Sequence, residues 1–307
     1  MKCSGTDYTT FNEAAVAAVI RSWSFITTPI RPSTEILAEY RKHFEAAADK
    51  PILIFGATPE LIDLAHEVGC PEIVSIDWNA DNFEAMRRIA RRDWSRASFR
   101  HGNWVIPIEE LSGRFGCVAS DAGPVFLSFP EQWRGISAAA YSYLQDGGCW
   151  VSRSFDWPGE TLSFESNFQQ HVDDLEAARP ALDRDGELAA FKAMTVHIRL
   201  RSMQNVVDEN GMIDQKEFAR RNDEATRILA EKYPDADFRE IVDMNLQRLV
   251  RPRPDQSDLQ SVVPPALACP PLQQMGFMTK VTHLSKAIPN SGFMLAATKL
   301  GPDARLT

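Results

Sequence analysis

The chain has 307 residues, of which 44% are hydrophobic and 24% are charged, a composition typical of a folded globular protein and not of a disordered chain. Lys and Arg number 33 and Asp and Glu number 42, so the net charge is −9. This balance argues against a general nucleic-acid binder, because phosphate contacts need concentrated basic side chains. The sequence contains no apolar run of about 18 residues and no apolar signal core near the N-terminus, which predicts a cytoplasmic protein without a membrane partner. The five scattered cysteines include no CxxC pair, so neither a zinc site nor a disulfide framework is expected.

The first 50 residues predict two helices joined by a proline-containing segment. Thr10 and Glu13 have capping-box spacing and precede an amphipathic stretch that reaches Trp23. The segment TTPIRPS (27–33) breaks this pattern, and Ser33 is suited to cap a second helix over 34–48. We expect residues 1–50 to form a helical lid.

From residue 51, short apolar runs alternate with amphipathic stretches. Helices are expected near 59–68, 80–92 and 131–144, and strands at 51–56, 72–77, 97–102, 116–121 and 147–155. Such alternation predicts a parallel sheet with helices on both faces. Ligands bind such sheets at the carboxyl ends of the strands, so residues 51–155 are the expected cofactor-binding core.

Residues 156–265 interrupt the alternation and are mostly helix-like, with clear amphipathic stretches at 187–203 and 215–232. We expect a helical cap or substrate insertion here. Residues 266–307 return to strands, at 276–284 and 292–300, and the PNSG turn between them predicts an antiparallel pair. Proline clusters at 252–254, 264–265 and 270–271 mark breaks between these parts. The predicted fold class is therefore α/β: a Rossmann-like, doubly wound, mostly parallel seven-stranded sheet with a C-terminal antiparallel pair and a helical cap insertion.

The segment IFGATPEL (54–61) lies at the first strand–helix junction. Gly56 permits the tight turn that leaves the strand, Thr58 is a candidate N-cap and Pro59 fits the first helical position. Free backbone N–H groups at such a junction suit an anion. The loop has neither the further glycines of a dinucleotide fold nor the lysine of a P-loop, which argues against NAD, FAD and nucleoside triphosphates. An ordinary strand–helix turn is the alternative interpretation.

Polar residues follow the next strands at their carboxyl ends. Asp77 comes 21 positions after Gly56, where this fold class places an acid that accepts from ribose hydroxyls; the alternative is a cap for the next helix. Asn103 could form a hydrogen bond with an adenine edge, and Trp104 could cover the face of the ring. The alternative is a polar loop in which one aromatic residue packs on the core. Asp121 either orients a ligand or caps a turn.

The series ILIFGATPEL, IVSIDWNADNFEAM, FRHGNW, CVASDAGPVFL and YLQDGGCWVSRSF resembles the class I S-adenosylmethionine-dependent methyltransferases. The resemblance covers about residues 50–155 and the final strand pair. It implies S-adenosylmethionine as the cofactor, with its methionine part at Gly56, Ala57 and Thr58, its ribose at Asp77 and its adenine at Asn103. The expected cofactor site also includes these neighbouring residues: Arg31 from the lid, Trp78, Asn79, Trp104 and Asp121.

The chain departs from the family pattern at several positions. Ile54 stands where the family usually has an acid in the first strand. Thr58 and Glu60 stand where it usually has two of the loop glycines. A G-x-T-P-E-L variant occurs in the family, which indicates a subtype. The usual Asp of the adenine loop is Asn103, whose amide can donate as well as accept. DAGP (121–124) stands where methylases of DNA bases or glutamine have N/D-P-P-Y/F, which argues against a nucleic-acid substrate.

Methyl transfer from a sulfonium is an in-line displacement, so the protein must mainly align the reactants and exclude water. A base is needed only where the acceptor must first lose a proton. His197, in the 187–203 stretch, is the candidate base, and a packing histidine is the alternative; Glu165 and Asp173 are weaker candidates.

The expected activity is methyl transfer to an oxygen or nitrogen of a small-molecule acceptor, in a cytoplasmic enzyme that uses no metal. Three alternatives remain open: a protein that binds the cofactor without transferring methyl groups, a peptide or protein methyltransferase, and an NAD-linked oxidoreductase. The sequence gives no prediction of the oligomeric state.

Overall fold

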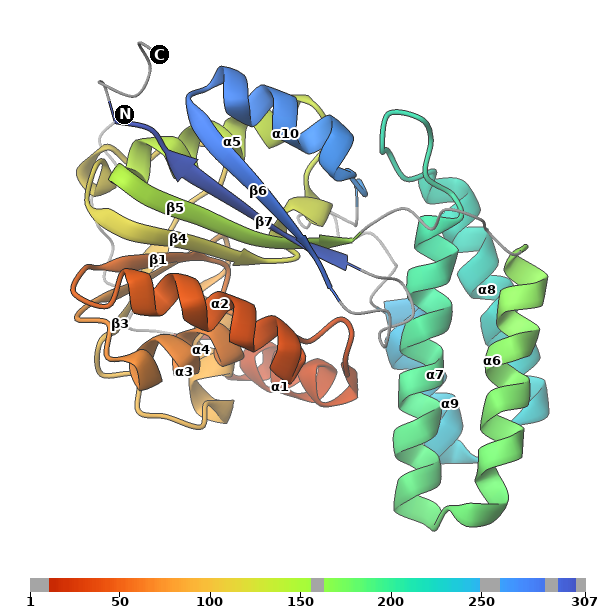
Figure 1. The fold of residues 1–307 in the computed structure, drawn as a ribbon. Helices are drawn as coiled ribbons and strands as arrows, with labels where there is room; N and C mark the ends of the chain where they lie inside the picture. The colour runs from red at the N-terminus through yellow and green to blue at the C-terminus, as the bar shows by residue number, and fades with distance from the viewer. Residues whose placement is uncertain (1–10, 156–162, 249–259, 285–291, 302–307) are drawn as a thin grey trace.

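A computed structural model describes residues 11–155, 163–248, 260–284 and 292–301. Its centre is a seven-stranded sheet in the order β3-β2-β1-β4-β5-β7-β6 (Figure 1). The strands are β1 (Ile52–Phe55), β2 (Ile73–Asp77), β3 (Ala97–His101), β4 (Phe115–Asp121), β5 (Leu144–Phe155), β6 (Phe277–His283) and β7 (Gly292–Lys299). The first five run parallel, and β7 pairs antiparallel with both β5 and β6. The predicted fold class is therefore confirmed, while the PNSG turn lies mostly outside the described residues.

Helices cover both faces of the sheet (Figure 1). One face carries α1 (Glu13–Phe25), α2 (Thr34–Ala46), α3 (Pro59–Val68) and α4 (Ala80–Ile89), and the other carries α5 (Glu131–Tyr143) and α10 (Pro265–Gln274). In α2 the buried Ile36, Tyr40 and Phe44 recur every four residues and so lie on the helix face that packs on the sheet.

The N-terminal helix begins differently from the predicted capping box. Asn12 is its N-cap, and its side-chain oxygen accepts from the N–H groups of Ala14 and Ala15. Glu13 then falls at the first helical position and binds Arg88 of α4, at 2.6 and 2.7 Å. Asn is as good an N-cap as Thr or better, and the contact with α4 fixes where the chain enters the helix. Thr10 lies outside the described residues.

Two further elements differ from the prediction. Pro270 and Pro271 lie inside α10, although the proline clusters were expected to mark breaks. Pro265 is tolerated at the start of this helix because the N–H that proline lacks would have no acceptor at that position. The burial of Ala268 and Leu272 against the sheet holds the helix in place. In addition, β5 begins at Leu144 rather than at the predicted Gly147, with a register shift against β4.

A helical unit lies beyond the carboxyl ends of the parallel strands (Figure 1). It consists of α6 (Phe164–Ala178), α7 (Arg184–Gln204), α8 (Gln215–Lys232), α9 (Ala236–Val242) and the π-helical turn η4 (Asp243–Arg248). One face of α7, with Val196, Leu200 and Met203, belongs to an apolar cluster that includes Ala122 and Phe155 at the ends of β4 and β5. The helical unit is therefore packed directly against the edge of the sheet where ligands bind in this fold class. None of the helices in the described ranges has the length and apolar character of a membrane span.

Candidate functional site

The loop after β1 lies at the carboxyl ends of the central strands β2, β1 and β4, a region that we call the crevice. Gly56 has φ = +90°, a conformation that glycine adopts without strain, and its N–H donates to the carbonyl of Ile76 at 2.8 Å. A Cβ atom added to Gly56 would lie 3.4 Å from the Trp104 ring and 3.9 Å from Asp77 Oδ2. The structure thus brings together three of the residues predicted for the cofactor site, contributed by three different segments.

Asp77 is the last residue of β2, and its carboxyl group lies beside Gly56. Its Oδ1 accepts from the Asn79 N–H at 3.0 Å. Burial raises the pKa of Asp77 to about 6, although hydrogen bonds from Asn79, Trp78 and Asn82 oppose the rise. Near neutral pH the side chain is a carboxylate in an environment that disfavours its charge, so a ligand that donates hydrogen bonds to it would be stabilised.

The residues that follow Asp77 have different surroundings. Trp78 is 56% exposed, and its ring centroid lies 5.7 Å from that of His101, the last residue of β3. Asn79 is the N-cap of α4, where its side-chain oxygen accepts from the Asp81 N–H at 2.9 Å. Trp78 therefore offers an open ring face beside the crevice, whereas the oxygen of Asn79 already serves the helix.

The loop after β3 contributes an exposed amide and a half-buried indole. Asn103 is exposed, and its Oδ1 accepts from the Val105 N–H at 3.1 Å. The Trp104 Nε1–H donates to the Ile76 carbonyl at 2.8 Å. A Cβ atom added to Gly123, after β4, would lie 3.4 Å from this indole. Trp104 consequently lies between the ends of β1 and β4, held in one orientation.

Asp121 at the end of β4 is bound into a buried network. The Arg153 guanidinium contacts its two oxygens, at 2.7 and 3.0 Å. Only 4% of the Asp121 side chain and 1% of the Arg153 side chain are exposed. The Tyr40 hydroxyl donates to the Ser120 carbonyl at 2.7 Å and accepts from the Arg153 N–H at 3.0 Å. Burial raises the pKa of Asp121, and the charge of Arg153 offsets part of that rise.

The same arginine ties the segment between α1 and α2 to the strand ends. Its Nη2 donates to the Ile30 carbonyl at 2.5 Å, and its Nη1 donates to the Pro29 carbonyl. Arg31 in this segment pairs with Glu60 of α3, with Nε 2.7 Å from Oε1. This segment (residues 26–33), which we call the lid segment, is therefore bound to β5 and to the start of α3, which directly follows Ala57 and Thr58.

The candidate base lies elsewhere. His197 in α7 is partly buried, with its ring centroid 5.5 Å from that of His171 in α6. Burial lowers the pKa of His197 to about 4, with smaller contributions from His171 and Arg201. Glu165 and Asp173 are exposed on α6. His197 is thus a neutral imidazole at the contact between two helices, and its catalytic role stays a prediction.

Three residues of the crevice were absent from the predicted site: Tyr40, Glu60 and Arg153. Arg153 could have been found in the sequence, because it is a charged residue within the otherwise buried strand β5, and charged side chains are rarely fully buried without a partner. Glu60 stands in the sequence at the position of a usual loop glycine, and nothing there indicates its pairing with Arg31. Nothing in the sequence pattern distinguishes Tyr40 from the other apolar-face residues of α2.

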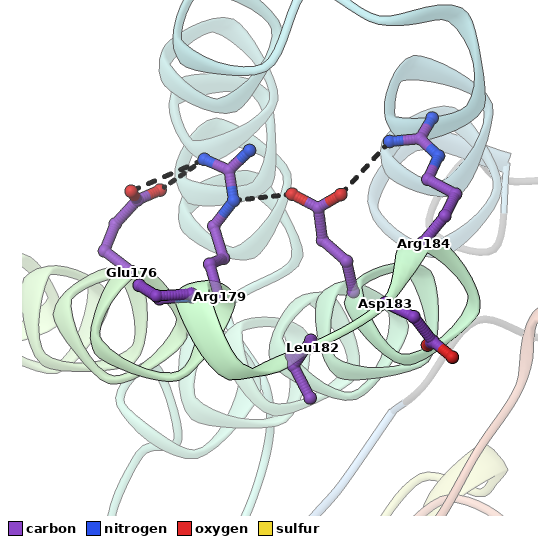
Figure 2. Close-up of a pocket in the computed structure, with 7 residues that line it drawn as sticks. Glu176, Arg179, Leu182, Asp183 and Arg184 are labelled. Carbon is purple, nitrogen blue, oxygen red and sulfur yellow. Dashed lines mark hydrogen bonds and ion pairs between the residues drawn. The ribbon is translucent and has the colours of Figure 1, made fainter.

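A shallow depression of about 450 Å³ lies at the tip of the α6–α7 hairpin (Figure 2). Arg179 pairs there with Glu176 and Glu187, and Arg184 pairs with Glu187. This hairpin tip is remote from the strand ends (Figure 1), and ion pairs already satisfy its charges, so the crevice is the stronger candidate site. Within the described ranges, no group of three or more His, Cys, Asp or Glu side chains is arranged to hold a metal ion.

Comparisons with known proteins support the fold. No family model matches the sequence, and no curated protein matches it. A Rhodobacter sphaeroides protein, provisionally described as a zinc-dependent alcohol dehydrogenase, is similar with a TM-score of 0.54 at 14% identity, over 92% of this chain and 98% of that one. A SAM-dependent methyltransferase from Methanosarcina mazei gives 0.46 at 12% identity, over 82% and 93%. An O-methyltransferase family protein from Burkholderia thailandensis gives 0.48 at 10%, over 89% and 57%.

These are likenesses of fold alone, and the order of the strands identifies which fold it is. Five parallel strands in the order β3-β2-β1-β4-β5, followed by β7 inserted antiparallel between β5 and β6, form the Rossmann-like sheet of the methyltransferases named in the resemblance. The chain has the class I S-adenosylmethionine-dependent methyltransferase fold.

Proposed function

We propose that the protein is an S-adenosylmethionine-dependent methyltransferase that transfers a methyl group to an oxygen or nitrogen of a small molecule. The observation that carries this proposal is the meeting of Gly56, Asp77 and Trp104 at the carboxyl ends of the central strands. A positive-φ glycine lets a ligand approach the backbone, and Asp77 supplies acceptor oxygens for a ribose.

The residues of the crevice fit such a cofactor. Asp77 is half-buried and its carboxyl pKa is raised, and hydrogen-bond donors of a ligand would favour its charged form. Trp78 presents an exposed ring beside it, suited to a base. Three acids, Glu60, Asp77 and Asp121, outnumber the two arginines of the crevice, so the local charge favours a cationic ligand such as a sulfonium.

When bound, the cofactor supplies an electrophilic methyl group. The tasks left to the chain are to hold the reactants in line and to keep water out. The lid segment is bound to Arg153 through the Ile30 carbonyl, and Leu200 of α7 belongs to one apolar cluster with Ala122 and Phe155 at the ends of β4 and β5. Apolar side chains beside the strand ends support a small-molecule acceptor. His197 remains the proposed base for acceptors that must lose a proton.

A nicotinamide-linked dehydrogenase is the second candidate, favoured by the description of the Rhodobacter sphaeroides protein. The single glycine of the first loop argues against it, because a pyrophosphate needs closer approach to the backbone than one glycine allows.

The two candidates differ in what stabilises the protein. Thermal unfolding is measured with S-adenosylmethionine, S-adenosylhomocysteine, NAD⁺ and NADH. A ligand at 100 times its Kd adds about 2.7 kcal/mol to the free energy of unfolding. We expect a higher Tm with the two adenosyl sulfur compounds only. A shift with the nicotinamide nucleotides alone would replace the proposal with the second candidate. Binding of S-adenosylmethionine without methyl transfer to any acceptor would favour the alternative of a non-methylating binding protein.

A further inference from the structure

Glu60 is an acid at a position where the resembled family usually has a loop glycine. It is the second residue of α3, and 14% of its side chain is exposed. Arg31 of the lid segment donates to its Oε1 through both Nε and Nη2. The other oxygen, Oε2, is buried and accepts no hydrogen bond from the described residues.

A buried carboxylate oxygen without a donor is costly, and such groups in folded proteins are usually satisfied by a ligand, an ion or water. Asp121 differs in this respect, because Arg153 and Tyr40 engage both of its oxygens. Glu60 lies close enough to Asp121 for its charge to raise the pKa of Asp121. Of these two neighbouring acids, Glu60 is the one with an oxygen available to a ligand.

A buried donor without a partner belongs to the ring that Arg31 contacts. The Arg31 guanidinium carbon is 5.2 Å from the centroid of the Trp23 ring. The Trp23 Nε1–H is buried and has no acceptor among the described residues. Both side chains in contact with this guanidinium therefore carry an unsatisfied group, an acceptor on Glu60 and a donor on Trp23, as expected for a site that receives a ligand with both donors and acceptors.

The backbone beside Glu60 favours a carboxylate. Thr58 occupies the N-cap of α3 without a side-chain capping bond, and Pro59 has no N–H. The N–H of Glu60 is among the first of the helix, which have no acceptor within it and lie at its positive end. An α-amino acid carries a carboxylate and an ammonium on one carbon. Backbone and side chain of Glu60 together offer a partner for each.

We propose that the Glu60 carboxylate, positioned by Arg31, accepts a hydrogen bond from the α-ammonium group of the amino-acid end of the cofactor. This inference rests on the proposed function and adds to it a residue that determines ligand specificity. Ligands with a free amino group are selected over adenosyl thioethers that lack one. Arg31 acts as a positioning residue, because its guanidinium leaves one oxygen of Glu60 free for the ligand.

The test is calorimetric titration with S-adenosylhomocysteine and with its analogue in which hydrogen replaces the α-amino group. The proteins are wild type, Glu60→Gln, Glu60→Asp and, as the matched control on the same helix, Glu67→Gln, whose side chain is exposed and pairs with Arg41. A hydrogen bond to a charged group corresponds to about 10- to 100-fold in affinity. Wild type is expected to lose this factor when the amino group is removed.

Glu60→Gln is expected to bind S-adenosylhomocysteine about 10- to 100-fold more weakly while its affinity for the analogue changes less than about threefold. Glu60→Asp, which keeps the charge, and Glu67→Gln should both retain the preference for the amino group. Equal affinity of wild type for the two ligands would overturn the inference, and so would an equal loss for both ligands in Glu60→Gln. If wild type binds neither ligand, the proposed function itself fails, a result distinct from the others.

Discussion

At the scale of single residues, two aspartates at the carboxyl ends of parallel strands, one on each side of β1, have opposite surroundings. Asp121 is paired with Arg153 and hydrogen-bonded to Tyr40, so it ties elements together. Asp77 has no arginine beside it among the described residues, and burial dominates its titration. A carboxylate that the folded protein leaves without a countercharge is typical of a binding site.

The raised pKa of Asp77 has a consequence for stability. Its pKa is about 6 in the folded protein against an ordinary value of 3.8, so the ionised side chain destabilises the fold above pH 6, and this penalty disappears as the pH falls below the unfolded value. We predict that Asp77→Asn raises the free energy of unfolding by roughly 1–3 kcal/mol at pH 8. The amide oxygen of Asn can still accept from the Asn79 N–H.

Urea denaturation at pH 8 and at pH 4 checks this prediction, with Asp93→Asn, at an exposed position, as the control. The gain should be present at pH 8 and largely lost at pH 4. An equal gain at both pH values, or a loss at pH 8, would show that burial does not disfavour the charge of Asp77.

The sequence revealed the residues of the site whose roles depend on local position. Gly56 and Asp77 were predictable because a strand–helix turn and a strand end have characteristic residues at a set spacing. Arg153, Glu60 and Tyr40 were not, because their partners come from segments 29 to 124 positions away. A spacing pattern carries no information about such pairings.

At the scale of elements, Arg153 joins four segments: β5 itself, β4 through Asp121, α2 through Tyr40, and the lid segment through the Pro29 and Ile30 carbonyls. A fully buried arginine must have its donors satisfied. Here the lid segment provides two of the acceptors, so the lid is part of the folded core and not an appended arm.

We predict that Arg153→Met lowers the free energy of unfolding by about 3–5 kcal/mol, because it leaves Asp121 buried without a countercharge. Adding Asp121→Asn to Arg153→Met should recover part of this loss, since the uncompensated charge is then absent. Chemical denaturation of the two single variants and the double variant measures the coupling. A loss below about 1 kcal/mol in Arg153→Met would contradict the central position of this arginine.

Helices with a periodic pattern of apolar residues could be predicted from the sequence. Helix boundaries that depend on contacts with other elements could not. The helix over 59–68 and the helix over 215–232 agree with the structure at both ends. In contrast, α10 forms despite Pro270 and Pro271 because it packs on the sheet, and the start of α1 follows from its contact with α4. Tertiary packing overrides local propensity in both cases.

At the scale of the whole molecule, the helical unit and the sheet meet mainly through apolar side chains. Leu200 of α7 is 3% exposed and belongs to the cluster shared with the ends of β4 and β5. The exposed ion pair between Arg21 of α1 and Glu240 of α9 also bridges the two parts. Burial stabilises far more than an exposed pair does.

We predict that Leu200→Ala lowers the free energy of unfolding by about 2–5 kcal/mol, whereas Glu240→Ala lowers it by less than about 1 kcal/mol. Urea denaturation followed by circular dichroism checks both values. The reverse order would mean that the surface pair, and not the apolar contact, holds the cap against the sheet.

Whether this fold is used for an adenosyl sulfur cofactor is the central question for the molecule. The most direct measurement is calorimetric titration with S-adenosylhomocysteine of wild type, Asp77→Ala and the control Asp93→Ala. Micromolar binding by wild type and the control, weakened more than about tenfold in Asp77→Ala, is the predicted result. No heat and no change in Tm with wild type would contradict the proposed function, and the crevice at Gly56 would then serve a different ligand.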